Sequence, residues 1–172
     1  MKLKHLALAA AIGVAGVPAM AVPTVIDWGA HATTEADSSY FAAGSTFDRI
    51  LTFNLGGTFA ALAVAVTNDY LDYFNISGAK VELFKNNGVL TTYTDDAALG
   101  SFNFDSTAVG NTFANLGSGD YYYRVTGAVV GSLGGSYVLT SSISPVPEPE
   151  SMALLLAGLG VVGFIARRRR PQ

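Results

Sequence analysis

Between residues 22 and 144 the chain alternates short apolar segments with glycine and asparagine turns. The clearest pair is 47–55 (FDRILTFNL) and 58–67 (TFAALAVAVT), which flank Gly56-Gly57. No stretch keeps the 3.6-residue apolar period of a helix, and turn signals recur roughly every 8–12 residues, as in sandwiches built from short strands. The pattern therefore predicts an all-β fold for residues 22–144, an antiparallel β-sandwich of jelly-roll type.

Further strands are predicted at the same spacing. They lie at residues 70–76, 80–85, 89–94, 101–105, 112–116, 121–127 and 136–144. The Asn-Asn-Gly turn at 86–88 predicts a hairpin between 80–85 and 89–94, because Asn-Gly accepts the positive φ values of a tight turn. The alanines of 58–67 share one face of the strand, and such small residues predict close packing against another layer. A helix is the alternative for this alanine-rich run.

The N-terminal residues have the three parts of a secretory signal peptide. Two lysines precede an apolar run at residues 6–17, and Ala19 and Ala21 supply small residues at the cleavage site. We predict that the signal peptide spans residues 1–21 and that the exported domain spans residues 22–144.

The C-terminal end combines a tether, an apolar segment and a cationic tail. Residues 145–151 hold three prolines, which favour an extended tether. Residues 152–166 carry no charge and predict a transmembrane helix, although 15 residues span roughly 22 Å and a bilayer usually takes about 20 residues. Ser151 can lengthen the run, and arginine side chains can snorkel along it. Residues 167–172 then form a cytoplasmic tail, because clustered cations stay on that side of the membrane.

Removing the two ends changes the charge of what remains. The whole chain has a formal net charge of −3, whereas residues 22–150 keep four Lys and Arg against thirteen Asp and Glu, which gives −9. An acidic domain does not attract DNA or RNA through charge, so we expect no nucleic-acid partner. The chain has no cysteine, so it has neither a disulfide nor a thiol nucleophile.

The C-terminal features together resemble the PEP-CTERM protein-sorting signal. A Pro-Glu-Pro motif is followed by an apolar helix with a Gly-Leu-Gly at 158–160 and then by an arginine run. In that family the signal is read by an exosortase, an integral-membrane enzyme of exopolysaccharide-producing Gram-negative bacteria. The resemblance implies an exosortase partner, an inner-membrane-anchored precursor, removal of the tail after export, and a mature protein at the cell surface or outside the cell.

The resemblance also implies roles for individual residues. Residues 152–166 would be the transient anchor in the membrane. The recognition motif would be Pro147, Glu148 and Pro149, and the retention charge would be Arg167, Arg168, Arg169 and Arg170.

The body resembles the FxDxF subgroup of PEP-CTERM proteins. The closing strands of that subgroup are matched by 119–121 (GDY) and 134–137 (GGSY). The opening strand departs from the pattern, because Phe47 and Asp48 are adjacent and Phe53 lies five residues beyond the aspartate. The layout is also similar to the small β-sandwiches appended to secreted peptidases, a likeness of fold that implies no activity.

Catalytic chemistry has few candidates in the exported domain. His31 is the single histidine outside the signal peptide, and its polar surroundings in sequence predict a surface residue. One histidine without cysteine excludes the usual zinc sites, and no Gly-x-Ser-x-Gly motif occurs. We therefore predict a protein without catalytic residues, metal site or cofactor, that is, not an enzyme.

The acidic pairs leave two alternatives open. Two carboxylates suffice for glycoside hydrolysis, but Asp69/Asp72 and Asp95/Asp96 lie in turn contexts that favour solvated carboxylates. A calcium site in these loops is the sharper alternative, since Ca²⁺ takes loop carboxylates and carbonyls, although no D-x-D-x-D-G loop occurs.

Residues 121–127 (YYYRVTG) place three tyrosines in a row. Alternation predicts Tyr121 and Tyr123 on the core face and Tyr122 exposed beside Arg124. An exposed tyrosine can stack on a sugar ring, so Tyr122 is the candidate ligand contact. The sequence as a whole predicts an exported, non-enzymatic surface or matrix protein that is sorted by an exosortase and linked to exopolysaccharide. The alternative is a carbohydrate-binding module, with or without calcium.

Overall fold

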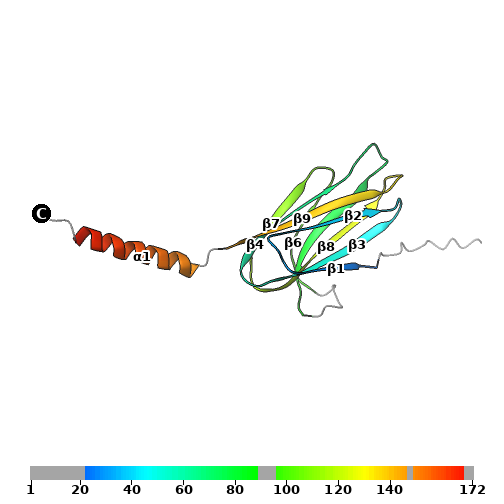
Figure 1. Ribbon diagram of the computed structural model, residues 1–172. Coiled ribbons are helices and arrows are strands. Elements are labelled where there is room, and N and C mark those ends of the chain that lie inside the picture. The colour runs from blue at the N-terminus through cyan, green and yellow to red at the C-terminus, as the bar shows by residue number, and fades with distance from the viewer. Residues whose placement is uncertain (1–21, 89–95, 147–148, 169–172) are drawn as a thin grey trace, which may run out of the picture.

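The computed structural model describes residues 22–88, 96–146 and 149–168, and within them nine strands form two facing sheets (Figure 1). The strands are β1 (Thr24–Ala30), β2 (Thr34–Phe41), β3 (Thr46–Leu55), β4 (Phe59–Thr67), β5 (Ile76–Lys85), β6 (Ala98–Asn103), β7 (Val109–Leu116), β8 (Gly119–Val129) and β9 (Gly135–Pro145). One helix, α1 (Pro149–Arg168), follows them. The predicted all-β sandwich is confirmed.

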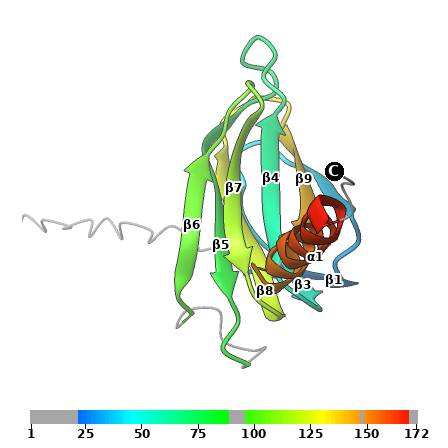
Figure 2. The ribbon, with the colours of Figure 1, turned by 90° about the vertical axis from the view of Figure 1, so that its left-hand side faces the viewer.

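The first sheet, sheet A, has the order β1-β3-β8-β5-β6, and the second, sheet B, has the order β2-β9-β4-β7. All strand neighbours are antiparallel except β1 and β3, which run parallel, from Thr24 opposite Arg49 to Ala30 opposite Asn54. The edge strands β6 and β7 lie side by side where the two sheets meet (Figure 2). The last two strands of the chain, β8 and β9, are therefore internal strands of the two sheets.

The core lies between the sheets and is rich in aromatic rings. Tyr121 and Tyr123 of β8 face inward, as predicted, and Tyr137 of β9 belongs to the same buried cluster, where its ring stacks on Phe41 and Phe47. On β4 the inward residues are Ala61, Ala63 and Ala65, all fully buried, so the predicted close packing of the alanine face is confirmed. The larger residues of β4, Leu62, Val64 and Val66, point outward.

One sequence prediction about the strands is wrong, and two strands were not predicted. Residues 70–76 were predicted as a strand, but Leu71 and Asp72 adopt left-handed φ values of 50° and 62°. They form a turn in which the backbone N–H groups of Tyr73 and Phe74 both donate to the Tyr70 carbonyl. Strands β1 and β2 were not predicted, because their few apolar residues alternate with polar ones at the margin of the sandwich.

The predicted hairpin partner at 89–94 lies outside the described residues. Strand β5 takes β6 and β8 as its two neighbours instead. The residues between β5 and β6 therefore connect these two strands.

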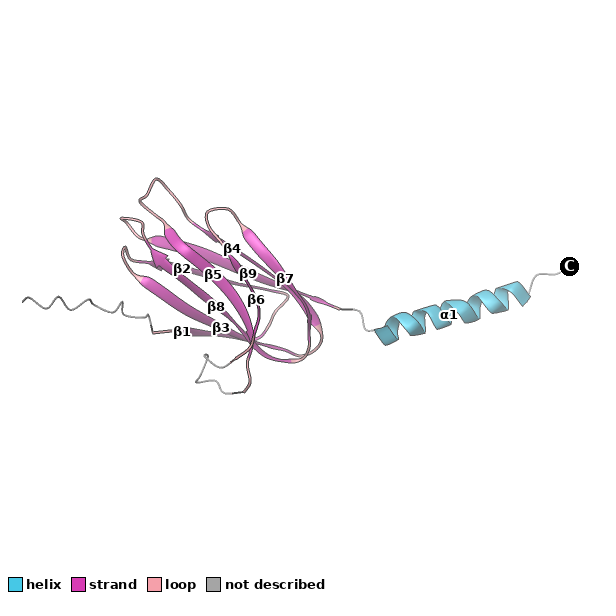
Figure 3. Cartoon of the chain, turned by 180° about the vertical axis from the view of Figure 1, so that it is seen from behind, coloured by secondary structure: helices cyan, strands magenta, loops and turns pink. Residues whose placement is uncertain are grey.

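Helix α1 contributes nothing to the core. All its side chains from Met152 to Arg168 are exposed, and the buried cluster is drawn from the strands and the loops that join them. Figure 3 shows the strands gathered in one body with the helix beyond the end of β9. The core of residues 22–146 is thus complete without the helix.

Candidate functional site

The C-terminal segment is the first candidate site. Strand β9 ends at Pro145, and α1 begins at Pro149 and continues through the apolar run to Arg168. Arg167 and Arg168 occupy its last turn, where cations interact favourably with the helix dipole. Residues 147–148 and 169–172 lie outside the described part, as do Ala19 and Ala21 of the predicted cleavage site.

The helix is longer than the apolar run predicted from the sequence. It holds 20 residues and includes Glu150, Ser151 and two of the four arginines. Among the helical residues that the structure describes, none form a segment with the length and hydropathy of a membrane span.

A depression of about 500 Å³ lies on the sandwich domain. It lies on sheet A, where β1 and β3 end and β8 begins. Two carboxylates and several polar side chains line it together with Val25, two aromatic residues and small residues. Among the lining residues are Asp27, Thr52, Phe53, Asn54, Asn86, Asp120 and Tyr121. Such a mixture can hydrogen-bond a hydroxyl-rich small ligand.

The carboxylates of the depression are held by neighbouring groups. Asp27 accepts hydrogen bonds from the Gly29 N–H at 2.9 Å and the Thr52 hydroxyl at 3.0 Å. These bonds, the Gly29 bond first, lower the pKa of Asp27 because they stabilise its charged form. Across the depression the Asn54 amide donates to Asp120 at 2.7 Å. Each carboxylate is therefore fixed in orientation.

The predicted exposure of Tyr122 is wrong. Its side chain does face away from Tyr121 and Tyr123, but it is 0% exposed. The ring of Phe84, its register partner on β5, lies parallel to it with centroids 4.9 Å apart. Alternation along a strand predicts the face correctly but not whether neighbours cover that face. Tyr122 therefore does not offer an open ring for a sugar.

The predicted surface position of His31 is also wrong. Its exposure is only 9%, and its ring lies edge-on to Phe53 with centroids 4.9 Å apart. Its Nε2 is 2.9 Å from the Ser141 hydroxyl, which also bonds the Tyr123 hydroxyl at 3.0 Å. A serine beside an imidazole has the composition of a nucleophile and base, but Ser141 is completely buried and no substrate can reach it.

Asp48 and Arg124 connect the two motifs that resemble the FxDxF pattern. Arg124 on β8 forms a bidentate pair with Asp48 on β3, with its Nη2 2.6 Å and its Nε 3.0 Å from the carboxylate oxygens. Phe47 and Phe53 point to the other face, into the core. The aspartate of the opening motif thus pairs with a strand that belongs to the closing motif.

The acidic pairs predicted as solvated turn residues or calcium ligands do not form a cluster. Asp69 and Asp72 are exposed in the loop before β5, and Asp95 lies outside the described residues. Asp96 accepts a hydrogen bond from the Asn87 N–H. Across the described residues, no three acidic or histidine side chains lie close enough to hold a metal ion together.

Comparison with known proteins adds the following. No curated protein matches this chain. Among solved structures it is similar to the pre-peptidase C-terminal domain of a collagenase from Bacillus anthracis, at 17% identity and a TM-score of 0.44, over 72% of this chain and 97% of that domain. It is also similar to PliG, a periplasmic inhibitor of g-type lysozyme. The Aeromonas hydrophila protein is 15% identical with a TM-score of 0.43, over 72% of this chain and 100% of that one. The Salmonella Typhimurium protein is 11% identical with a TM-score of 0.36, over 73% and 100%.

The C-terminal segment matches a family model. The model describes the PEP-CTERM protein-sorting motif, and it covers residues 145–170. The match takes in the proline-rich tether, helix α1 and all four arginines. The chain therefore carries a PEP-CTERM protein-sorting motif.

Proposed function

We propose that this chain is an exported, non-enzymatic protein of the cell surface or extracellular matrix, delivered by an exosortase that recognises residues 145–170. The observation that carries the proposal is the sorting motif placed directly after the last strand of a complete domain. The precursor would be held at the membrane by the C-terminal segment, and the mature domain would be released or attached outside, associated with exopolysaccharide.

The exported domain supports a role without catalysis. The described serine–histidine pair is sealed in the core. Charge also favours an extracellular role, since residues 22–144, with a net charge of −7, stay soluble and repel nucleic acid and anionic lipid.

The intact mass of the extracellular protein tests this proposal. It should be isolated from an exosortase-carrying host and from the same host without the exosortase. A mass for a chain that begins near Val22 and ends between Pro147 and Glu150, found only with the exosortase, is the expected result. A mass that retains Arg170 in both hosts would refute processing by the exosortase.

Carbohydrate binding is the second candidate function, and the depression beside Asp27 and Asp120 now supports it in place of Tyr122. Its amide, hydroxyl and carboxylate groups are suited to sugar hydroxyls. Retention of residues 22–146 on gels of neutral polysaccharides tests it. Asn54→Ala should lower retention, whereas Asn103→Ala, at an exposed position on β6, should not. No retention on any polymer would remove this candidate.

A further inference from the structure

The outer face of sheet B differs from that of sheet A in charge. On sheet A the outward side chains include six charged residues: Asp27, Asp48, Lys80, Glu82, Asp120 and Arg124. In the described strands of sheet B, the outward positions hold no charged residue. They are Thr34, Ala36, Ser38, Tyr40, Ala60, Leu62, Val64, Val66, Gly110, Thr112, Ala114, Ser136, Val138, Thr140, Ser142 and Ser144. We call these sixteen residues the uncharged face.

The centre of the uncharged face is apolar and partly open. Leu62 and Val138 are each 44% exposed, and Val66 lies directly opposite Val138 across the β4–β9 ladder. On β4 the larger residues point outward and the alanines inward, the reverse of what burial in an isolated sandwich favours. Small residues such as Gly110 and Ala36 lie at the margins of the face, and Tyr40, 61% exposed, is its one aromatic side chain.

We infer that the uncharged face is the interface of a homodimer, in which two copies pack sheet B against sheet B. The charge distribution singles out a second copy as the occupant. Residues 22–146 hold four Lys and Arg against eleven Asp and Glu, a net charge of −7, so two copies repel each other in most orientations. Packing through the uncharged face places the two charged outer faces of sheet A about three sheet spacings apart, roughly 30 Å. That distance is well beyond the Debye length of about 8 Å at physiological salt.

The size of the face sets the strength of the dimer. Its four strands hold 8, 11, 9 and 8 residues. At about 3.3 Å per residue and 4.8 Å between strands, the face covers about 570 Å². Two such faces bury about 1,100 Å² together, just above the roughly 1,000 Å² that a specific interface needs. The dimer is therefore weak and reversible. Because only like charges oppose it, added salt strengthens it.

Distances between spin labels, measured by electron paramagnetic resonance, show which faces of the two copies are in contact. The chain has no native cysteine, so a single spin label can be placed at Val64→Cys on the uncharged face or at Thr126→Cys on the outer face of sheet A. Residues 22–146 contain the whole core and are used first, followed by the full chain in detergent micelles. The expected backbone separation normal to the sheets is about 10 Å for the Val64 label and about 30 Å for the Thr126 label.

Sedimentation of charge variants provides the second arm. Val64→Glu should abolish the dimer, and Ser101→Glu, which adds the same charge to an exposed position of sheet A, should leave it intact. Thr112→Glu, at an exposed position on β7, repeats the test if Val64→Glu does not fold. Raising NaCl from about 50 mM to 500 mM should lower the dissociation constant of the unmodified domain, because screening removes repulsion.

Three results would overturn the inference. The first is a domain that stays monomeric at millimolar concentration and high salt. The second is a dimer that survives both Val64→Glu and Thr112→Glu. The third is a dimer in which the Thr126 labels are the closer pair, which would place the charged face in the interface.

Discussion

The buried hydroxyl of Ser141 allows a quantitative test of the polar contacts between the sheets. Ser141 on β9 bonds two groups that sheet A and its flanking loop bring inward, the Tyr123 hydroxyl at 3.0 Å and His31 Nε2 at 2.9 Å. Ser141→Ala removes both bonds and adds no bulk. Each buried group left without a partner costs about 1–3 kcal/mol. His31 keeps 9% of its surface exposed, so water compensates a small part of its loss, and we expect a total of about 2–4 kcal/mol.

Equilibrium urea unfolding of residues 22–146, followed by circular dichroism, measures this loss. With an m-value of about 2 kcal/mol/M, the midpoint should fall by about 1–2 M. Ser142→Ala is the matched control, because the adjacent Ser142 hydroxyl points outward to Thr34 and its bond is exposed. Its effect should stay within about 0.5 kcal/mol.

A double variant separates the two orphaned groups. Tyr123→Phe removes the phenol hydroxyl, so Ser141→Ala should cost less in the Tyr123→Phe background than in the native one. Equal destabilisation by Ser141→Ala and Ser142→Ala would refute the reasoning, since it would mean that water reaches Ser141. Strict additivity of Ser141→Ala and Tyr123→Phe would refute the coupling between them.

Three further predictions concern single side chains. Tyr122→Ala should destabilise the domain by about 3–5 kcal/mol in thermal or urea unfolding, because it empties a fully buried site against Phe84, whereas an exposed tyrosine would cost almost nothing. Burial raises the pKa of the Tyr123 phenol to about 12, so its ionisation favours the unfolded chain. The free energy of unfolding should therefore fall between about pH 10 and 12. Tyr123→Phe should make this fall with pH smaller. The pKa of Asp27 lies below that of an ordinary carboxyl, so Asp27 stabilises the fold at pH values above the ordinary pKa, and this contribution is lost as the pH falls through the lowered pKa. Thr52→Val should raise the Asp27 pKa in an NMR titration. An unchanged Asp27 titration midpoint would show that the Thr52 bond does not form.

Periodicity was enough to predict the sandwich and most of its strands. The alternation in β8 and the alanine face of β4 gave the correct inward residues because both are central strands with one face against the core. The sorting motif was equally readable, since its three parts are contiguous in sequence.

What failed depended on distant contacts. The aromatic segment 70–76 has strand-like composition, but Leu71 and Asp72 enter a left-handed turn whose carbonyls bond the loop before β9. His31 gave no local sign of burial, because the groups that cover it, Phe53 and Ser141, come from β3 and β9. No single-strand pattern could have found the depression either, as its residues come from several segments.

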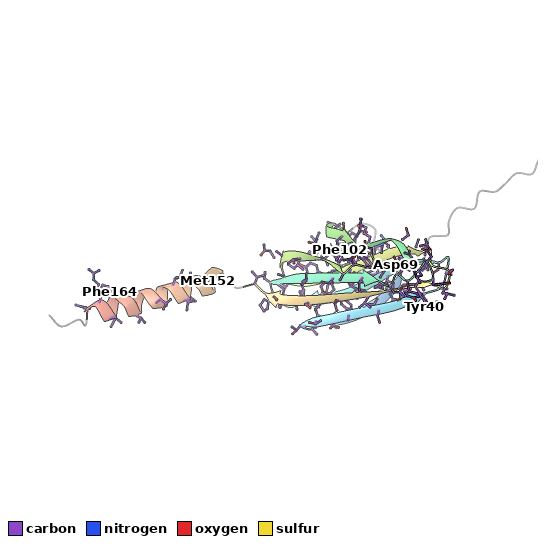
Figure 4. All side chains as sticks on the ribbon, turned by 90° about the horizontal axis from the view of Figure 1, so that it is seen from above. Tyr40, Asp69, Phe102, Met152 and Phe164 are labelled. Atoms are coloured by element: carbon purple, nitrogen blue, oxygen red, sulfur yellow. The ribbon has the colours of Figure 1, made fainter. Side chains whose placement is uncertain are left out.

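The end of the sandwich that lies away from the tail is readable from the fold. Figure 4 places Tyr40 and Asp69 at the end of the sandwich opposite the end where α1 leaves, which Met152 begins to trace. A protein held by its tail would therefore present the loops around Tyr40 and Asp69 away from the attachment point.

The placement of β8 and β9 has a consequence for the order in which the chain can fold. Strand β8 joins β3 to β5, and β9 joins β2 to β4, yet both lie in the last 27 residues before the tether, Gly119 to Pro145. A chain exported from its N-terminus can form only the partial ladders β1–β3, β5–β6 and β4–β7 until these residues emerge. Cooperative folding then has to wait for contacts that span most of the sequence, which makes it slow. We therefore expect both sheets to be completed only after residues 119–145 are available for pairing.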